Sequence, residues 1–537
     1  MTQVIKNPIL SGFYPDPSIC RVGSDFYLVT STFAYFPGIP VFHSKDLLSW
    51  KQIGNAIDRP GQLNYTDNQI SQGLFAPTIR ENNGTFYILC TLIKNGGNFI
   101  ITAKDPAGSW SDPIWLKELD GIDPSIFFDT DGKAWYCGTH PAPEGEAYSG
   151  NYEIFIRELD LNAASNGLNP LLGENIGIWR GALRDCIWPE GPHIYKIGAW
   201  YYLLHAEGGT GLDHAVCIAR AKNIRGPWEG KRSNPLVTHR HLGKRAEIIN
   251  VGHADLFDDA HGNWYMVLLA SRSADGVCPL GRETFIIPIF WENEWPFIAT
   301  ESGMVDEEIE IETYEEVKTK NEYSSECLTE KVCDHFKEKM PVNWLVLRMP
   351  VNENNAAFCL TSRNDALRLF TKKASMRSKE HPAFTGRRIR HHKWEFSIEI
   401  EFTPKTSQET AGLILLQSED YQYRLELFLS SADNQSLRLI KAAGKDIEEK
   451  IINITELHSP PKRLILKANC IDMKLSFFYS IDNHNMINIA QEEDAKILST
   501  EYAGGFVGSL AGVFASGNGI DTDNYADVIW AEYREIE

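Results

Sequence analysis

Short apolar stretches alternate with polar turns over the first 300 residues or so, and five of these stretches resemble one another. Each starts with a small or acidic residue, continues to an apolar position and a polar turn, and ends in an aromatic-rich stretch. They begin near residues 14, 75, 122, 190 and 252 and read YPDPSICRVGSDFYLVTST, FAPTIRENNGTFYILCT, IDPSIFFDTDGKAWYCGT, EGPHIYKIGAWYYLLHA and GHADLFDDAHGNWYMVLLA. Strand-forming stretches joined by turns such as NNG and TDG predict β-hairpins. The pattern therefore predicts a chain built from similar antiparallel units.

The first, second and fourth units share a further feature, a polar stretch and short loop that ends at Trp50, Trp110 or Trp228. Helical periodicity is almost absent from this region, which argues against an α/β barrel. Repeated units of several short strands are typical of the blades of a β-propeller. We therefore expect residues 1–305 to form a five-bladed β-propeller.

The rest of the chain has a different pattern. The segment 306–325 is strongly charged, and we interpret it as a linker. Residues 326–537 contain stretches such as WEFSIEIEF, YQYRLELFL and DVIWAEYREI, in which apolar and polar positions alternate with a period of two. This alternation predicts an antiparallel β-sandwich. The chain as a whole is therefore expected to be all-β with two domains.

The innermost strand of each propeller blade lines a central channel, so equivalent positions of the five units should meet there. Aligning the units on their shared apolar residue places five residues at one level: Asp16, Ala76, Asp123, Gly191 and His253. Glu190 stands one position before Gly191, between a proline and a glycine, where Glu is a poor turn residue. We therefore expect three carboxylates from three blades, Asp16, Asp123 and Glu190, to face one site on the axis.

Two carboxyl groups facing one site are the minimum equipment for hydrolysis of a glycosidic bond. One is protonated and acts as general acid, and the other is ionised and activates water or attacks carbon. Glu190, beside Trp188 and two prolines, suits the acid, and Asp16, held in PDP, suits a fixed base. Asp123 would position the acid and favour its protonated form by charge repulsion.

Each of these residues also has an ordinary structural interpretation. An Asp before Pro is commonly a turn residue, but two DPSI copies at equivalent positions favour a shared role. His253 could be a core histidine, and Arg282, which precedes a strand in LGRETF, a solvated surface residue. Phe33 and Phe75 could be core aromatics rather than surfaces that bind sugar.

Composition narrows the class of partner. The 52 basic and 72 acidic side chains give a net charge of −20, which repels nucleic acid and anionic membranes. The N-terminus lacks the apolar region of a secretory signal, and the ten cysteines are scattered without a C-x-x-C pair. From these features we expect a cytoplasmic protein with reduced thiols and no membrane contact.

Seven motifs in order along the chain resemble glycoside hydrolase family 43. They are NPILSGFYPDPSI, FYLVTSTFAYFPGIPVFHSKDL, GIDPSIFFD, PEGPHIY, LLHAEGGT, GHADLF and LGRETF. The most similar branch is that of the two-domain β-xylosidases, which also act on α-L-arabinofuranosides, and the resemblance covers essentially the whole chain. It implies a five-bladed propeller followed by a concanavalin-like sandwich.

The resemblance also implies roles for single residues. In an inverting mechanism, Asp16 is the general base, Glu190 the general acid and Asp123 the residue that modulates and orients the acid. Arg282 binds hydroxyl groups of the non-reducing sugar, and His253 lies at the channel axis. The remaining residues implied for the same subsite are Phe33, Phe75, Ala76 and Thr210. A loop of the sandwich closes over the site with an aromatic residue, and EYAGGFVG offers Tyr502 and Phe506.

Two departures affect the substrate. The family commonly has Trp where Phe75 stands, and DCIWPEGPH places bulky residues just before the acid. We expect an exo-acting β-1,4-xylosidase that takes xylo-oligosaccharides, with an α-L-arabinofuranosidase as the nearest alternative. A non-catalytic sugar-binding propeller and a retaining hydrolase of the invertase type are more distant ones. The resemblance further implies a homo-oligomer, dimer or tetramer, and no required cofactor, although some members hold a calcium ion near the residue equivalent to His253.

Overall fold

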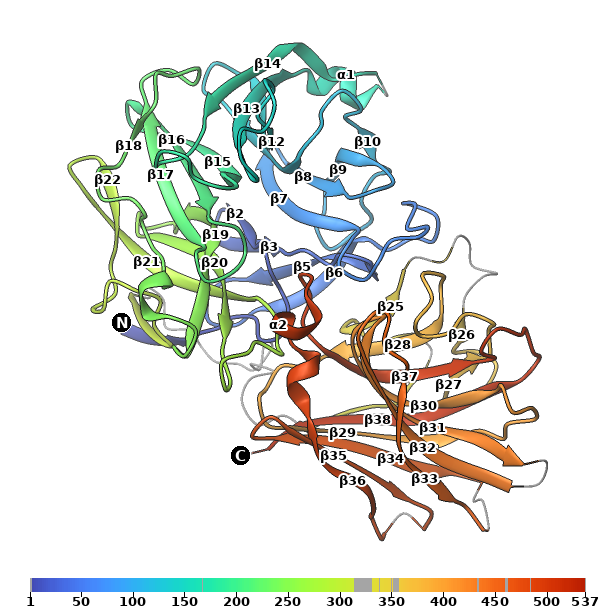
Figure 1. Cartoon of the computed structure of the whole chain (residues 1–537). Helices are drawn as coiled ribbons and strands as arrows, with labels where there is room; N and C mark the ends of the chain where they lie inside the picture. Colours follow the sequence, from blue (N-terminus) through green and yellow to red (C-terminus); the bar gives the residue numbers. More distant parts are fainter. Residues whose placement is uncertain are drawn as a thin grey trace.

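A computed structural model describes residues 2–166, 168–312, 331–337, 339–348, 350, 357–431, 434–458, 462–482 and 484–536. Figure 1 shows two β-rich bodies side by side, a ring of blades formed by the first 300 residues and a layered body formed by the last 200 or so. The predicted all-β class, with a five-bladed propeller and a C-terminal sandwich, is confirmed. Cys327 and most of the predicted linker lie outside the described residues.

The propeller consists of five antiparallel four-stranded sheets. Blade I contains β2 (Ser18–Val22), β3 (Asp25–Val29), β5 (Gly38–Ser44) and β6 (Lys51–Ile57). Blade II contains β7 (Leu74–Asn82), β8 (Thr85–Leu92), β9 (Gly97–Ala103) and β10 (Ile114–Trp115), and blade III contains β11 (Ile122–Phe128), β12 (Ala134–Pro141), β13 (Tyr152–Leu159) and β14 (Leu171–Trp179). Blade IV contains β15 (Glu190–Ile197), β16 (Trp200–Glu207), β17 (Ala215–Ala221) and β18 (Glu229–Gly230), and blade V contains β19 (Ile248–Asp258), β20 (Trp264–Arg272), β21 (Glu283–Glu292) and β22 (Trp295–Ile298).

The five positions aligned from the sequence share an unusual backbone conformation. All have positive φ: 55° at Asp16, 41° at Ala76, 54° at Asp123, 57° at Gly191 and 41° at His253. In blades II to V the register between the first two strands shifts at this position, as at a β-bulge. Positive φ is costly for residues other than glycine, so it persists only where the surrounding structure enforces it. The five blades therefore share a positive φ at the aligned position, and four of them also share a bulge there.

The N-terminus and the end of the propeller domain pair with each other. Strand β1 (Thr2–Lys6) forms an antiparallel ladder with β23 (Glu308–Glu312), which lies within the segment predicted to be a linker. The alternation EIEIE explains this strand, because Ile309 and Ile311 are both 4% exposed and pack with Ile5, while Glu308 and Glu310 are exposed. Regular structure of the propeller domain therefore extends past residue 305.

The C-terminal domain is a sandwich of two eight-stranded sheets. One sheet contains β24 (Lys331–Asp334), β26 (Phe358–Cys359), β27 (Leu367–Phe370), β29 (Trp394–Glu401), β34 (Leu464–Ile471), β35 (Lys474–Ser480), β36 (Ile487–Asp494) and β38 (Tyr525–Glu535). The other contains β25 (Trp344–Leu347), β28 (Ala383–Arg388), β30 (Thr410–Ser418), β31 (Tyr421–Ser431), β32 (Asn434–Ala443), β33 (Lys450–Glu456), β37 (Leu510–Ser516) and, from the propeller, β4 (Tyr35–Phe36).

Strand β4 joins the two domains, because Tyr35 and Phe36 pair with Leu347 and Val346 of β25 at the edge of the sandwich. The core at this junction is shared: residues of the first two blades pack with sandwich residues such as Phe384 and Phe514. A shared sheet and a shared core fix the position of one domain on the other.

Helices are few in the described residues. They are α1 (Leu161–Ser165), α2 (Thr500–Ala503) and the 3-10 turns η1 (Arg240–Leu242) and η3 (Ala495–Leu498). Figure 1 shows α2 at the junction of the two domains. No helix in the described part of the chain has the length and apolar character that crossing a membrane requires.

Candidate active site

Asp16 lies just before β2 of blade I, has a positive φ of 55° and is 6% exposed. One carboxylate oxygen accepts a hydrogen bond from Ser31 Oγ at 2.6 Å, and the other pairs with Arg282 Nη1 at 2.8 Å. Ser31 is held in turn, because its hydroxyl accepts the backbone N–H of Ala76 at 2.7 Å. Both oxygens of Asp16 are therefore fixed, one by Ser31 of the same blade and the other by Arg282 of blade V.

This environment keeps Asp16 ionised. Burial raises the pKa of its carboxyl group, but the positive charge of Arg282, the nearby His253 and the hydrogen bond from Ser31 outweigh burial and hold the pKa below its ordinary value. An ionised carboxylate with fixed geometry is what a general base requires.

Glu190 stands in the turn Pro189–Pro192 that starts β15, and blade III holds this turn at three points. Thr139 Oγ1 donates to the carbonyl of Pro189 at 2.6 Å, and Ser125 Oγ donates to the carbonyl of Pro192 at 2.5 Å. The backbone N–H of Gly191 donates to Asp123 Oδ2 at 3.0 Å. The turn is thus clamped from the side, which explains how an unusual residue can occupy it.

Glycine is required beside Glu190. Gly191 has φ of 57°, and a Cβ at this position would lie 2.9 Å from the ring of His253. A side chain here would be strained and would collide with the axial histidine. The glycine therefore allows the acid-bearing turn to approach the axis closely.

Glu190 and Asp123 are a coupled pair of carboxyl groups. Burial raises the pKa of Glu190 well above its ordinary value, and the charges of Asp123 and Asp16 raise it further. Burial also raises the pKa of Asp123, but the Gly191 amide and the nearby His253 favour its ionised form. We infer that a proton shared by this pair resides on Glu190.

The structure also brings His253 and Arg282 to this site. His253, in β19, is 7% exposed, and its Nδ1 lies 4.0 Å from Asp123 Oδ2. Arg282 is also 7% exposed, which excludes the interpretation as a solvated surface residue. Ala76 contributes its backbone N–H to the Ser31 hydroxyl rather than a side-chain contact.

Three phenylalanines pack against one another at this site, and two of them lie beside the Arg282 guanidinium. The ring centroids of Phe33 and Phe75 are 5.3 Å apart, and the ring of Phe506 is 6.1 Å from Phe33 and 5.6 Å from Phe75. The guanidinium carbon lies 5.6 Å from the centre of the Phe506 ring and 5.9 Å from that of Phe33. Tyr502, by contrast, is 51% exposed on α2, so Phe506 is the aromatic residue that the sandwich places at the site.

The segment that carries Phe506 docks closely on the propeller. Arg282 Nη2 donates to the carbonyl of Phe506 at 3.4 Å, and Ser71 Oγ accepts its backbone N–H at 2.9 Å. Gly281 and Gly508 meet where the segments cross, and a Cβ on Gly281 would lie 2.7 Å from Gly508 N. The sandwich therefore completes the site and supports the arginine.

Thr210 follows the two glycines after β16. Its neighbour Gly209 has φ of 70° and approaches the ring of Trp188, so close that an added Cβ would lie 2.8 Å from it. Thr210 thus lies in the loop that packs beside the acid-bearing turn, and the roles predicted for it and for the other site residues stay predictions.

The structure also contains a buried polar layer, two residues after the aligned positions, that the sequence analysis does not predict. Asp255 accepts hydrogen bonds from both terminal nitrogens of Arg80 at 2.8 Å, from Ser18 Oγ at 2.7 Å and from Tyr195 at 2.6 Å. Arg80 also contacts His193 Nδ1 at 3.1 Å. The signal was present, because Ser18, His193 and Asp255 all stand two positions after an aligned residue. This layer ties four blades together beneath the carboxylates.

Comparison with known proteins agrees with this geometry. Residues 5–296 match the sequence profile of glycosyl hydrolases family 43, and residues 333–534 match that of the beta xylosidase C-terminal concanavalin A-like domain. The chain belongs to glycoside hydrolase family 43. It is therefore a glycoside hydrolase, and the resemblance inferred from the seven motifs is confirmed.

Relatives in family 43 match over the full length of the chain. A xylosidase/arabinosidase of Butyrivibrio fibrisolvens is 43% identical over 541 residues, which cover 99% of this chain and 100% of that protein. A non-reducing end alpha-L-arabinofuranosidase of Bacteroides ovatus is 34% identical, with 100% and 96% covered. The crystal structure of a xylan beta-1,4-xylosidase from Bacillus halodurans has a TM-score of 0.88 at 29% identity, with 99% of this chain and 100% of that one covered.

The calcium ion that some family 43 members hold can be tested against the residues around His253. Calcium takes six to eight oxygen ligands. His253 offers a ring nitrogen, and Asp123 Oδ2, the carboxylate oxygen 4.0 Å away, already accepts the Gly191 amide. These groups do not provide the oxygen ligands that a calcium site requires.

Proposed function

We propose that this family 43 enzyme is an exo-acting, inverting β-1,4-xylosidase that releases xylose from the non-reducing ends of xylo-oligosaccharides. The observation that carries the proposal is the different surroundings of two carboxyl groups at one axis, since Asp16 pairs with Arg282 and Ser31 whereas Glu190 lies near two other carboxylates. Asp16 is held ionised by Arg282, and Glu190 is held protonated by burial and by two neighbouring carboxylates.

The reaction follows from this difference. Glu190 donates its proton to the glycosidic oxygen as the bond to the leaving sugar breaks. Asp16 accepts a proton from a water molecule, which attacks the anomeric carbon from the opposite face of the ring. Asp123 holds the Gly191 amide and repels a negative charge on Glu190, so it keeps the acid both oriented and protonated. Each turnover leaves Glu190 ionised and Asp16 protonated, and proton exchange with solvent restores both.

The surroundings of Arg282 support the exo mode and a small sugar. Phe33, Phe75 and Phe506 form a wall beside the guanidinium, with Phe506 supplied by the second domain. A wall of this kind limits how far a sugar chain extends past the arginine. Arg282 donates one N–H to Asp16 and one to the carbonyl of Phe506, and its remaining N–H groups are available for sugar hydroxyl groups. Relatives named beta-xylosidase, such as that of Bacillus subtilis at 32% identity, support xylose as the released sugar.

A second activity, on α-L-arabinofuranosides, uses the same three carboxylates. It is supported by the names of the Butyrivibrio fibrisolvens and Bacteroides ovatus relatives. Both sugars are pentoses at a non-reducing end, so both meet the same arginine and aromatic wall. We place the xylosidase activity first and include a cytoplasmic location and a dimeric or tetrameric state in the proposal.

Two assays test the proposal. Proton NMR of the first product from a β-xyloside should show α-xylose, and initial release of β-xylose would contradict Asp16 as the base. Turnover of nitrophenyl β-xyloside should exceed that of nitrophenyl α-L-arabinofuranoside, and the reverse order would make the enzyme an arabinofuranosidase. Absence of turnover on both would support a non-catalytic sugar-binding protein. Light scattering after gel filtration tests the oligomer, and cell fractionation tests the location.

A further inference from the structure

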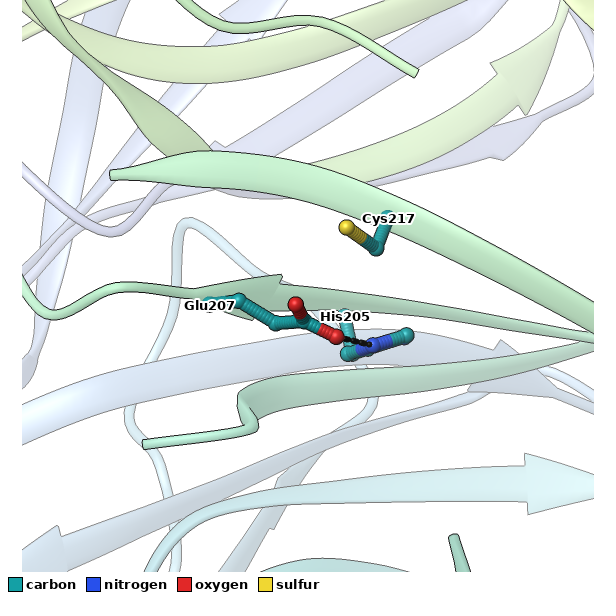
Figure 2. A group of neighbouring side chains, drawn as sticks. All are labelled: His205, Glu207 and Cys217. Carbon is teal, nitrogen blue, oxygen red and sulfur yellow. Dashed lines mark hydrogen bonds and ion pairs between the residues drawn. The ribbon is translucent and has the colours of Figure 1, made fainter. Parts of the chain in front are cut away.

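A cluster of metal-binding side chains lies in blade IV, apart from the three carboxylates. Figure 2 shows His205 and Glu207 on β16 and Cys217 on β17 with their side chains pointing toward one another. Their ligand atoms all lie within 4.8 Å of one another, and all three residues are buried. We propose that His205, Glu207 and Cys217 form a binding site for a thiophilic divalent cation, specifically Zn²⁺.

The sheet explains why these three residues meet. His205 and Glu207 are two positions apart on one strand, so their side chains emerge on the same face. Cys217 is the cross-strand partner of His205 in the ladder between β16 and β17. Cross-strand neighbours and residues two apart on one face are the closest side chains in a sheet. The ligands therefore stand on rigid elements.

The hydrogen bonding of His205 is incomplete. Its Nε2 lies 2.8 Å from Glu207 Oε1 and 3.2 Å from the indole nitrogen of Trp179, which can only donate. One ring nitrogen cannot both accept from Trp179 and donate to Glu207. Its Nδ1, although buried, has no partner among the described residues. A buried imidazole with two competing partners on one nitrogen and none on the other is the observation that points to a further ligand.

The donor set selects the metal. A ring nitrogen, a carboxylate oxygen and a sulfur are the three kinds of protein ligand that Zn²⁺ accepts, whereas Ca²⁺ and Mg²⁺ prefer oxygen alone. Ligand atoms around tetrahedral zinc lie about 3.3–3.8 Å apart, given its bond lengths. The His205–Glu207 pair at 2.8 Å must therefore separate by about half an ångström, and the Cys217 sulfur, which lies within 4.8 Å of both, must take up the same spacing.

An ion can reach the cluster past the segment 180–187. Leu183, Arg184 and Asp185 in this segment are exposed, and Cys186 in the same segment is half-buried. A Cβ placed on Gly181 would meet both Cys186 Sγ and Glu207 Oε1, so this second thiol lies beside the cluster.

The cluster also supports the chain that leads to Glu190. The backbone N–H of Ala182 donates to Glu207 Oε1, and the N–H of Gly208 donates to the carbonyl of Ile187 at 3.0 Å. Glu207 thus accepts a hydrogen bond from the loop when the site is empty, and in our proposal it binds the metal when the site is filled. Zinc at this site would be structural in effect, because it binds side chains behind the acid-bearing turn rather than the three carboxylates.

Metal binding can be measured on the full chain without substrate, so its outcome is independent of the proposed function. The protein is freed of metal with a chelator and titrated with Co²⁺, which substitutes for Zn²⁺ and reports thiolate ligation by a charge-transfer band. We expect one equivalent to produce the band, Zn²⁺ to abolish it by displacement, and Zn²⁺ to raise the thermal midpoint. Absence of a thiolate band, or Zn²⁺ without effect on the midpoint, would overturn the proposal.

Variants locate the site. Cys217→Ser should abolish the band, and Glu207→Gln, which keeps shape, should weaken Co²⁺ binding more than about tenfold. Cys137→Ser is the matched control, because Cys137 is an equally buried thiol in β12 of blade III and should leave the band intact. If Cys217→Ser does not fold, Glu207→Gln decides. Unchanged Co²⁺ affinity in Glu207→Gln would place the metal elsewhere and contradict the assignment.

Discussion

The carboxylates of blade I and blade IV differ in environment although both meet at the axis. Asp16 has an arginine at 2.8 Å and a serine hydroxyl at 2.6 Å, and its pKa lies below the ordinary value. Burial and the negative charges of Asp123 and Asp16, by contrast, hold the pKa of Glu190 well above the ordinary value. Nothing in the chemistry of a carboxyl group distinguishes acid from base, so the neighbours decide the role.

The two residues are also held differently. Asp16 is fixed through its own side chain by Ser31 and Arg282, whereas Glu190 is fixed through the backbone of its turn by Thr139, Ser125 and Asp123. Holding a base by its oxygens keeps it ionised, since donors favour the charged form. Holding an acid by its backbone leaves its carboxyl group free to remain protonated.

The largest expected effect is that of Asp16→Asn. The amide cannot accept a proton from water, so kcat should fall roughly 10³–10⁴-fold on every substrate, whatever its leaving group. Steady-state rates on xylobiose and on dinitrophenyl xyloside measure this loss. Substantial activity on the activated substrate alone would mean that Asp16 does not act on water.

Arg282→Leu removes the cation that keeps Asp16 ionised. We expect kcat/KM to fall about 10–100-fold through the lost charge-assisted hydrogen bonds. The pKa of Asp16 should also rise, because burial then acts without opposition from the arginine. The acid limb of the pH profile of kcat/KM should therefore move to higher pH. A lower rate with an unmoved acid limb would limit Arg282 to sugar binding.

Asp123→Asn tests the other member of the comparison. Loss of its negative charge should lower the pKa of Glu190, so the alkaline limb of the pH profile should move to lower pH. The amide oxygen can still accept the Gly191 N–H, so the turn should stay in place. A pH profile identical to that of the unmodified enzyme would show that Asp123 does not influence Glu190 and is an ordinary turn residue.

Thr139→Val should have the smallest effect. It removes one neutral hydrogen bond from the acid-bearing turn, worth about 1 kcal/mol, or roughly fivefold in kcat. Thr91→Val is the matched control, because Thr91 stands at the equivalent position of blade II and donates to Asn98 at 2.6 Å. Equal losses in the two variants would show that the clamp does not serve the acid.

Features that recur in every blade can be predicted from the sequence, whereas contacts between residues far apart in the chain cannot. Five similar units revealed the propeller, and their alignment found the five positions that share positive φ. The pairing of Arg282 with Asp16 joins residues 266 positions apart and leaves no local pattern. The same holds for β4, two residues of the propeller that extend a sheet of the sandwich.

Two further differences between the predictions and the structure concern single segments. The charge of the segment at Glu308–Glu312 predicts a linker, whereas its alternation of apolar and polar residues predicts a strand. The segment forms a strand because β1, from the other end of the domain, pairs with it. Tyr502 and Phe506 are both aromatic residues of one loop, and only docking on Ser71 and Arg282 selects Phe506. The layer around Asp255 could have been predicted from the alignment, because Ser18, His193 and Asp255 each stand two positions after an aligned residue.

The most direct test of the opposed roles of Glu190 and Asp16 is the dependence of rate on the leaving group in Glu190→Gln. A general acid matters most when the departing oxygen is strongly basic. Glu190→Gln should therefore lose several orders of magnitude on xylobiose and far less on dinitrophenyl xyloside, while Asp16→Asn loses the same factor on both. Equal losses on both substrates in Glu190→Gln would show that Glu190 does not protonate the leaving group, and the account would fail.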